Sequence, residues 1–289
     1  HGTQAQKDKY LGGITHGTDI WVQGFSEPGA GSDLASLRTS AVRDGDHYVI
    51  NGQKIWSSGG MHARYCLLLA RTNPHAKRKH DGISYFIMDM QSPGIEVRPI
   101  RQITGEAEFA EMFLDDVRIP AENLIGAEND GWNIAQSTLS TERGLLIFGE
   151  VERLTRSFEL DRREARDTWM RDVQFRREYA AFYAELQTVR LMIRKLLIEL
   201  EANPDKVSPT LPIYIKLTWG PFLQRYAEFL VRAEGLESLK WQPAIPGTGH
   251  SSRMRMQDFL KSYGWTIAGG SNEIMRNIVA ERILGLPRG

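Results

Sequence analysis

The sequence predicts an α+β chain, in which an antiparallel, β-barrel-like domain over residues 19–128 precedes an antiparallel four-helix bundle over residues 129–289. Three observations support this fold class. Short apolar runs follow one another closely before residue 128, with turn residues but no helical stretches between them. After Gly131, apolar residues recur every three or four positions, with charges on the opposite faces. The segments of this second kind are long and their connections are short, which is typical of a helix bundle.

The strands are expected in the first of these regions. Residues 42–50 read as a strand, an Asp44-Gly45 turn and a second strand, and Asn51-Gly52 predicts another turn directly afterwards. Further apolar runs, each expected to be a strand, lie at residues 67–70, 83–88 and 111–114.

The helices are expected in the second region, where Asn203-Pro204 ends one of them. Residues 243–249 contain proline and glycines and are expected to form a loop. The predicted helices cover residues 132–160, 172–202, 209–239 and 272–284.

The composition restricts the class of protein. Of 289 residues, 41% are apolar and 25% are charged, which is normal for a globular protein in water. The formal net charge is zero, so no general attraction to nucleic acid or acidic membranes is expected. The single cysteine, Cys66, excludes an internal disulfide and favours a reducing, cytoplasmic location; its apolar neighbours predict a buried thiol. No apolar stretch is long enough to span a membrane, and the seven histidines lack metal-ligand spacing.

Residues 21–33 (WVQGFSEPGAGSD) are the most informative segment. A β-prone run stops in a loop that contains Pro28, two glycines and the hydroxyls of Ser26 and Ser32. Pro28 restricts one backbone angle, and Gly29 and Gly31 permit angles that other residues avoid. Such a loop suits a large polar cofactor or a phosphate-bearing substrate. Its composition alone also fits an ordinary surface loop.

Glu142 is a candidate catalytic group on physical grounds. It shares a predicted helix face with Leu139, Leu145 and Leu146, and a carboxylate on an apolar face loses hydration, which raises its pKa. It is therefore either functional or paired in a buried ion pair with Arg143 or Arg153. The residues alone leave both interpretations open.

Three separated segments resemble the acyl-CoA dehydrogenase family: residues 21–33, residues 51–60 (NGQKIWSSGG) and residues 269–276 (GGSNEIMR). They occur in the family's order, and the resemblance extends over essentially the whole chain. It implies that residues 1–18 are the end of an N-terminal helical domain, followed by a middle β domain (19–128) and a C-terminal bundle (129–289). It also implies FAD as cofactor, an acyl-CoA substrate and α,β-dehydrogenation to a trans-2-enoyl-CoA. An electron-transferring flavoprotein would accept the electrons, and the enzyme would be a homo- or hetero-oligomer, either a dimer or a tetramer.

The resemblance also implies roles for individual residues. Most members of the family hold the catalytic glutamate at the position of Gly269, which has no carboxylate. Members similar to isovaleryl-CoA dehydrogenase hold it on the first helix of the bundle beside an arginine, which matches Glu142 and Arg143. Substrate contacts are expected at Ser32, Ser140, Arg143, Gly269 and Gly270. FAD contacts are expected at Gln23, Phe25, Ser26, Gly31, Ser32, Trp56, Ser58, Arg166, Thr168, Ser271 and Glu273.

Some of these positions have simpler interpretations. Trp56 could be a core residue at a strand end, and Glu273 could serve only a helix-capping box. Residues 247–252 match poorly the loop that contributes to a partner subunit's cofactor site in the family. Gly269 and this loop therefore keep one alternative open, a non-catalytic or half-catalytic subunit of a heteromeric dehydrogenase. A flavin oxidase or monooxygenase on the same scaffold is a further alternative. Because Ala268 and Gly269 are small, the pocket is expected to admit a branched or ring-bearing acyl group, such as a sterol side chain.

Overall fold

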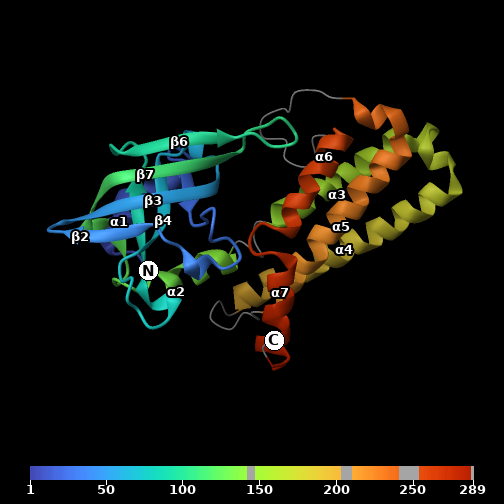
Figure 1. Cartoon of the computed structure of the whole chain (residues 1–289). Helices are drawn as coiled ribbons and strands as arrows, with labels where there is room; N and C mark the ends of the chain where they lie inside the picture. The colour runs from blue at the N-terminus through green and yellow to red at the C-terminus, as the bar shows by residue number, and fades with distance from the viewer. Residues whose placement is uncertain (142–146, 203–209, 241–253, 288–289) are drawn as a thin grey trace. The chain divides into compact units, whose positions relative to one another are not determined.

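A computed structural model describes residues 1–141, 147–202, 210–240 and 254–287 of the chain. The chain divides into two compact units, His1–Thr138 and Leu139–Gly289 (Figure 1). The first contains a mixed sheet and the second is helical, which confirms the α+β class.

The first unit begins with helix α1 (Gln4–Thr15), whose start is set by a capping box. The Thr3 side chain accepts from the Gln6 backbone amide, while the Gln6 side chain accepts from the Thr3 amide. The Tyr10 ring packs edge-on against Trp21 and Tyr65, so aromatic contacts hold α1 to the sheet.

One sheet of eight strands forms most of this unit (Figure 1). Its path runs β6-β7-β3-β2-β4-β5-β8, with β1 beside β4. Neighbours are antiparallel except for β1 with β4 and β2 with β4, two parallel pairings that the sequence did not indicate. The strands are β1 (Trp21–Gly24), β2 (Ser40–Asp44), β3 (His47–Ser58), β4 (Tyr65–Arg71), β5 (Ile83–Asp89), β6 (Ile95–Ile100), β7 (Phe109–Pro120) and β8 (Leu124–Ile125).

The predicted hairpin at Asp44-Gly45 is present, because Asp44 pairs with His47 and Gly45 has a φ of 62°. The predicted turn at Asn51-Gly52 is wrong. Strand β3 continues through both residues, with only a register irregularity opposite β7. The Asn51 side chain exchanges two hydrogen bonds of 2.9 Å with Asp116 on β7, so it supports strand pairing and does not close a turn.

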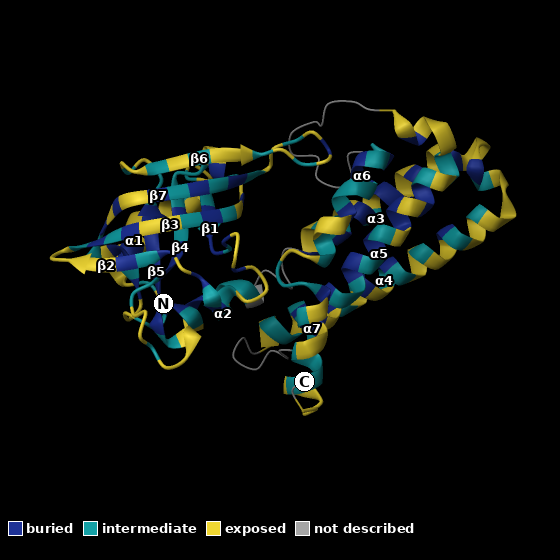
Figure 2. Cartoon of the chain, in the orientation of Figure 1, coloured by how far each residue is buried: buried dark blue, intermediate teal, exposed yellow. Residues whose placement is uncertain are grey.

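The interior of the first unit lies along the central strands, whose alternate residues are dark in Figure 2. Cys66 is fully buried there, as predicted. The buried apolar side chains of this core, named the sheet core below, are Val22, Ala41, Tyr48, Ile50, Cys66, Leu68, Ala70, Phe86, Met88, Met112, Leu114, Val117 and Ile119.

The described helices follow the predicted order with two differences. Residues 142–146 of the predicted helix 132–160 lie outside the described part of the chain, so the prediction is not tested there. The predicted last helix, 272–284, is α-helical only at its start and continues as a π-helix over Val279–Ile283. The sequence did not predict α6. The helices are α2 (Gly131–Thr141), α3 (Ile147–Glu164), α4 (Val173–Ala202), α5 (Leu211–Glu234), α6 (Arg255–Ser262) and α7 (Asn272–Ile278).

In the second unit, α3, α4 and α5 lie side by side and enclose an aromatic-rich core (Figure 1). The rings of Phe158 and Tyr226 stack with centroids 4.1 Å apart, and Phe222 is fully buried. Short α6 is attached to this bundle by a charged group: Arg255 pairs with Asp161 of α3 at 2.6 Å and with Glu234 of α5 at 2.7 Å. This polar attachment explains why apolar periodicity does not reveal α6.

Candidate functional site

The first motif leaves the sheet at the end of β1 and folds into a tight turn. Glu27 and Ala30 exchange backbone hydrogen bonds of 3.0 Å, with Pro28 and Gly29 at the tip. The chain then enters a short 3₁₀-helix, η1 (Leu34–Ser36). Proline favours the first central position of such a turn because its φ is already restricted.

The predicted contacts of this motif are not equally accessible. Gly31 and Ser32 are exposed, and Gln23 and Ser26 are half-buried. Phe25 is buried and its ring packs edge-on against Tyr85, at 5.8 Å between centroids. The Phe25 ring is therefore part of the interior, which limits any contact it makes with a cofactor.

The glycines of the loop serve a different purpose from the one expected. Neither Gly29 nor Gly31 has a left-handed φ, so the proposed need for unusual backbone angles is wrong. A Cβ atom at either position would meet no atom within 4 Å. The glycines thus lie beside open space, which lets another molecule approach the backbone closely.

The second motif ends strand β3, where the strand is irregular. Trp56 has a left-handed φ of 62°, and the register with β7 shifts between Lys54 and Ser57. The Trp56 side chain is 54% exposed and contacts Phe109 edge-on, which argues against the interpretation as a core residue. Ser58 is exposed beside it. This strand end presents an aromatic face next to a hydroxyl.

The first two motifs are joined by hydrogen bonds within the sheet unit. The Ser57 hydroxyl donates to the Gln23 carbonyl oxygen at 3.0 Å, and the Ile55 amide donates to the Ser26 carbonyl oxygen at 2.9 Å. An exposed aromatic face, nearby hydroxyls and a loop open to close approach fit a planar cofactor with polar edges, such as a flavin.

A buried ion pair between the two motifs was missed by the sequence analysis. The Lys54 ammonium is fully buried; it donates to Glu27 Oε1 at 2.8 Å and to the Phe25 carbonyl oxygen at 3.1 Å. Glu27 also accepts from the backbone amides of Arg38 at 2.7 Å and Thr39 at 2.9 Å. The sequence did contain one indication that Lys54 is buried. Residues two apart on a strand face the same side, and Lys54 is an even number of positions from the inward-facing Tyr48 and Ile50.

Burial and charge pairing have opposite effects on the pKa values of Lys54 and Glu27. Burial lowers the pKa of Lys54, since an ammonium loses its hydration there. Burial alone would raise the pKa of Glu27, but Lys54 and the hydrogen bonds from Thr39 and Arg38 lower it below its ordinary value. The carboxylate is thus held in its charged form.

The third motif lies in the helical unit, at the start of α7. Gly269 and Gly270 both have left-handed φ values, of 67° and 95°, which a glycine adopts without strain. Ser271 is the N-cap residue of α7 and accepts from the Ile274 amide at 3.4 Å. Glu273 is at the second helical position and not the third, which a capping box requires. Its pKa is lowered by hydrogen bonds from its own backbone amide and from Ser271.

The second predicted pair in the helical unit lies at the end of α3. Arg166 belongs to the 3₁₀-helix η6 (Ala165–Asp167), and Thr168 follows it; both are exposed. The Thr168 hydroxyl donates to the Ala165 carbonyl oxygen at 3.3 Å. An exposed guanidinium in this position is available to a phosphate.

Other predicted positions lie outside the described residues. They include the proposed base Glu142, its neighbour Arg143 and the poorly matching stretch 247–252. Ser140 lies in the last turn of α2, where only the backbone is described.

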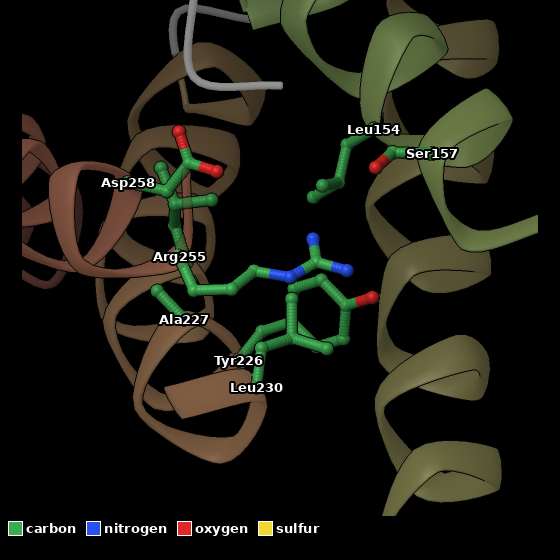
Figure 3. A pocket seen from close by; sticks show the side chains of 8 residues that line it. Leu154, Ser157, Tyr226, Ala227, Leu230, Arg255 and Asp258 are labelled. Carbon is green, nitrogen blue, oxygen red and sulfur yellow. The ribbon is translucent and has the colours of Figure 1, made fainter. Parts of the chain in front are cut away.

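A small pocket in the helical unit is unrelated to these motifs. Figure 3 shows it between α3, α5 and α6, where the Arg255 side chain extends beside Tyr226. Its volume of about 20 Å³ suits one water molecule but not a cofactor. Among the described residues, no group of three acidic, histidine or cysteine side chains could hold a metal ion. The helices that the structure describes include none with the length and apolar character needed to cross a bilayer.

Comparison with known proteins gives consistent matches. The model of the acyl-CoA dehydrogenase middle domain matches residues 23–117, and that of the acyl-CoA dehydrogenase C-terminal domain matches residues 129–284. The acyl-CoA dehydrogenase IpdE1 of Mycobacterium tuberculosis is 38% identical, over 99% of this chain and 72% of its own length. The acyl-CoA dehydrogenase FadE34 of the same organism is 38% identical, over 100% of this chain and 38% of its own.

Solved structures agree with the sequence matches. The Tcur3481-Tcur3483 steroid ACAD superposes with a TM-score of 0.86 at 33% identity, over 99% of this chain and 73% of the other. The ChsE4-ChsE5 complex from Mycobacterium tuberculosis superposes with a TM-score of 0.84 at 30% identity, over 100% of this chain and 74% of the other.

Proposed function

The chain belongs to the acyl-CoA dehydrogenase family, and we propose that it oxidises an acyl-CoA thioester to a trans-2-enoyl-CoA with bound FAD and with Glu142 as the base. The observation that carries the proposal for FAD is the joined pair of motifs in the sheet unit. There, the exposed ring of Trp56 and the hydroxyl of Ser58 end a strand that is hydrogen-bonded to the open loop of Ser26 and Gly31.

Each unit contributes proposed FAD contacts, and the family resemblance assigns those of Arg166 and Thr168 to the cofactor of a neighbouring subunit. Trp56 supplies an aromatic surface for the flavin ring, and Ser58 a hydrogen bond to its edge. The Arg166 guanidinium suits a pyrophosphate. The remaining proposed FAD contacts are Gln23, Phe25 (through its backbone), Ser26, Gly31, Ser32, Thr168, Ser271 and Glu273.

The proton-transfer step is assigned to Glu142. It removes the proton from the carbon beside the thioester carbonyl, and Arg143 stabilises the carboxylate as its electrostatic neighbour. FAD, when bound, supplies the acceptor for the hydride that leaves the next carbon. Gly269 supports this assignment because it offers no carboxylate, and its left-handed backbone would strain any residue with a Cβ.

We propose a bulky acyl group as substrate. Ala268 and Gly269 are small where the substrate is expected, and Ser32, Ser140, Arg143 and Gly270 complete the proposed substrate contacts. A similar structure is named a steroid ACAD, and a relative 28% identical is named cyclohexane-1-carbonyl-CoA dehydrogenase from Geobacter metallireducens. Both names specify ring-bearing compounds, which supports the proposal of a branched or ring-bearing acyl chain.

An electron-transferring flavoprotein is the proposed electron acceptor, and the enzyme is proposed to be an oligomer.

A second candidate function is that of one subunit of a two-chain dehydrogenase. The similar structures whose names join two proteins, Tcur3481-Tcur3483 and ChsE4-ChsE5, favour it. If the purified chain takes up FAD but reduces it with acyl-CoA only when a second chain is added, this candidate replaces the homo-oligomer.

Replacement of Glu142 by Gln tests the assigned base. We expect E142Q to lose about 10²–10⁴-fold in kcat with an artificial electron acceptor, because the proton no longer has an acceptor group. FAD binding, measured by visible absorbance, should be retained. The control is Glu152→Gln, which removes a carboxylate paired with Arg190 on the neighbouring helix and should leave turnover unchanged. Unchanged turnover in E142Q would refute the assignment.

A further inference from the structure

The buried pair of Lys54 and Glu27 lies between the two motifs that carry the proposed flavin contacts. Lys54 is on β3, and both of its hydrogen-bond acceptors belong to the loop of the first motif. Phe25 and Glu27 are the residues on either side of Ser26, so the ammonium is bonded to both neighbours of a proposed contact. The loop is thereby bonded to the strand from within the protein.

Each contact of the pair restricts a different part of the site. Glu27 accepts from Arg38 and Thr39, where the chain leaves η1 and returns to the sheet, so it closes the loop at its far end. Trp56 is two residues beyond Lys54 on the same strand, has a left-handed backbone and lies where the register of β3 with β7 shifts. A shift of Lys54 would therefore move both the loop and the tryptophan.

Burying an ion pair in a protein interior costs desolvation free energy. A buried pair contributes little net stability compared with apolar side chains of similar size, because both charges lose their hydration. What it adds is a constraint on position: a loop that moved away from the strand would leave a buried charge without its partner, which is strongly unfavourable. The pair therefore suits a requirement for position better than one for stability.

We propose that Lys54 and Glu27 are positioning residues, which set the loop of Ser26 against the strand of Trp56 and so hold the proposed flavin contacts at the correct spacing. This inference rests on the proposed function, because it concerns residues that would contact FAD. Neither Lys54 nor Glu27 would itself contact the cofactor, because both side chains are buried.

The test compares three variants of the whole chain with the wild type. K54M removes the charge and keeps an unbranched side chain that is one heavy atom shorter, and the double variant K54M/E27Q removes both charges. The control is Ile119→Ala, a truncation in the sheet core at the β7 residue that pairs with Tyr48 of β3, six positions before Lys54. The measurements are the FAD dissociation constant, the visible spectrum and reduction potential of the bound flavin, and the urea midpoint.

We expect K54M to bind FAD at least about tenfold more weakly and to change the visible spectrum and potential of the flavin. The double variant should recover much of the urea midpoint, because no unpaired charge is left in the interior, and yet keep the weak FAD binding. I119A should lose stability without a change in the flavin spectrum or potential.

Two outcomes would overturn the inference. One is a folded K54M or double variant that binds FAD with wild-type affinity, spectrum and potential. The other is an I119A variant whose flavin properties change as much as those of K54M at equal loss of stability. If K54M does not fold, the double variant decides alone. A wild-type chain that binds no FAD would instead refute the proposed cofactor, and the two failures are therefore distinguishable.

Discussion

At the scale of single residues, Cys66 gives the most direct prediction about pH. Burial raises the pKa of this thiol from its ordinary value of 9.0 to about 12. Below pH 9 the thiol is protonated in both the folded and the unfolded chain, so its full contribution to stability is present. Between pH 9 and 12 only the unfolded chain loses the proton, and the free energy of unfolding should fall by up to about 1.4 kcal/mol per pH unit.

Cys66→Ala isolates this effect from that of other groups that titrate in alkali. Urea unfolding of the wild type and C66A from pH 8 to pH 10.5 measures both slopes, and the remaining titrating groups are the same in the two proteins. We expect the wild type to lose stability more steeply above pH 9. Equal slopes would show that the thiol is accessible to solvent in the folded chain.

The residues also show how far a sequence can locate a site. Motif order led to Trp56, Ser58 and the loop of Ser26, and in the structure hydrogen bonds join these two segments. The partnership of Lys54 with Glu27 was not predictable, because the two are 27 positions apart along the chain and meet only through the fold. Similarly, nothing in the sequence distinguishes the buried ring of Phe25 from an accessible one.

At the scale of elements, Arg255 links α6 to the helical bundle through buried ion pairs. Arg255 pairs with Asp161 and Glu234, and Asp161 is fully buried, with the Tyr226 hydroxyl as a further donor at 3.1 Å. R255M leaves the Asp161 carboxylate buried without its cation. We expect this variant to lose about 3–5 kcal/mol of unfolding free energy, measured by urea titration with far-UV circular dichroism.

A surface ion pair of the same unit supplies the control for this prediction. Arg232→Met removes the pair of Arg232 with Glu178, in which the arginine side chain is half exposed, and should cost about 1 kcal/mol or less. The double variant D161N/R255M should recover part of the loss, since it buries no unpaired charge. Equal stability of R255M and R232M would mean that the Asp161 pair does not hold α6 to the bundle.

The elements differ in how well the sequence predicted them. Periodic apolar residues placed α4 almost to the residue, because Leu186, Val189 and Ile193 all face the core. The same rule could not find α6, whose buried positions are mainly polar, such as Arg255 and Asp258. At Asn51, a dipeptide common in turns was overridden by pairing across the sheet.

At the scale of the whole molecule, the described residues form two hydrophobic cores, each contained in its own unit. Leu68 and Phe222 are fully buried in the sheet core and the helical core, respectively. Truncation of either to alanine should cost about 2–5 kcal/mol, but in different units. Cys66 reports on the sheet unit, since its thiol reacts with a reagent only after local or global opening.

We therefore expect L68A to accelerate modification of Cys66 by a thiol reagent in dilute urea, while F222A leaves that rate near the wild-type value. In far-UV circular dichroism, F222A should lose its helical signal at a lower urea concentration than L68A, because α5 belongs to the helical unit. If F222A accelerated Cys66 modification as much as L68A does, the two units would unfold as one cooperative structure.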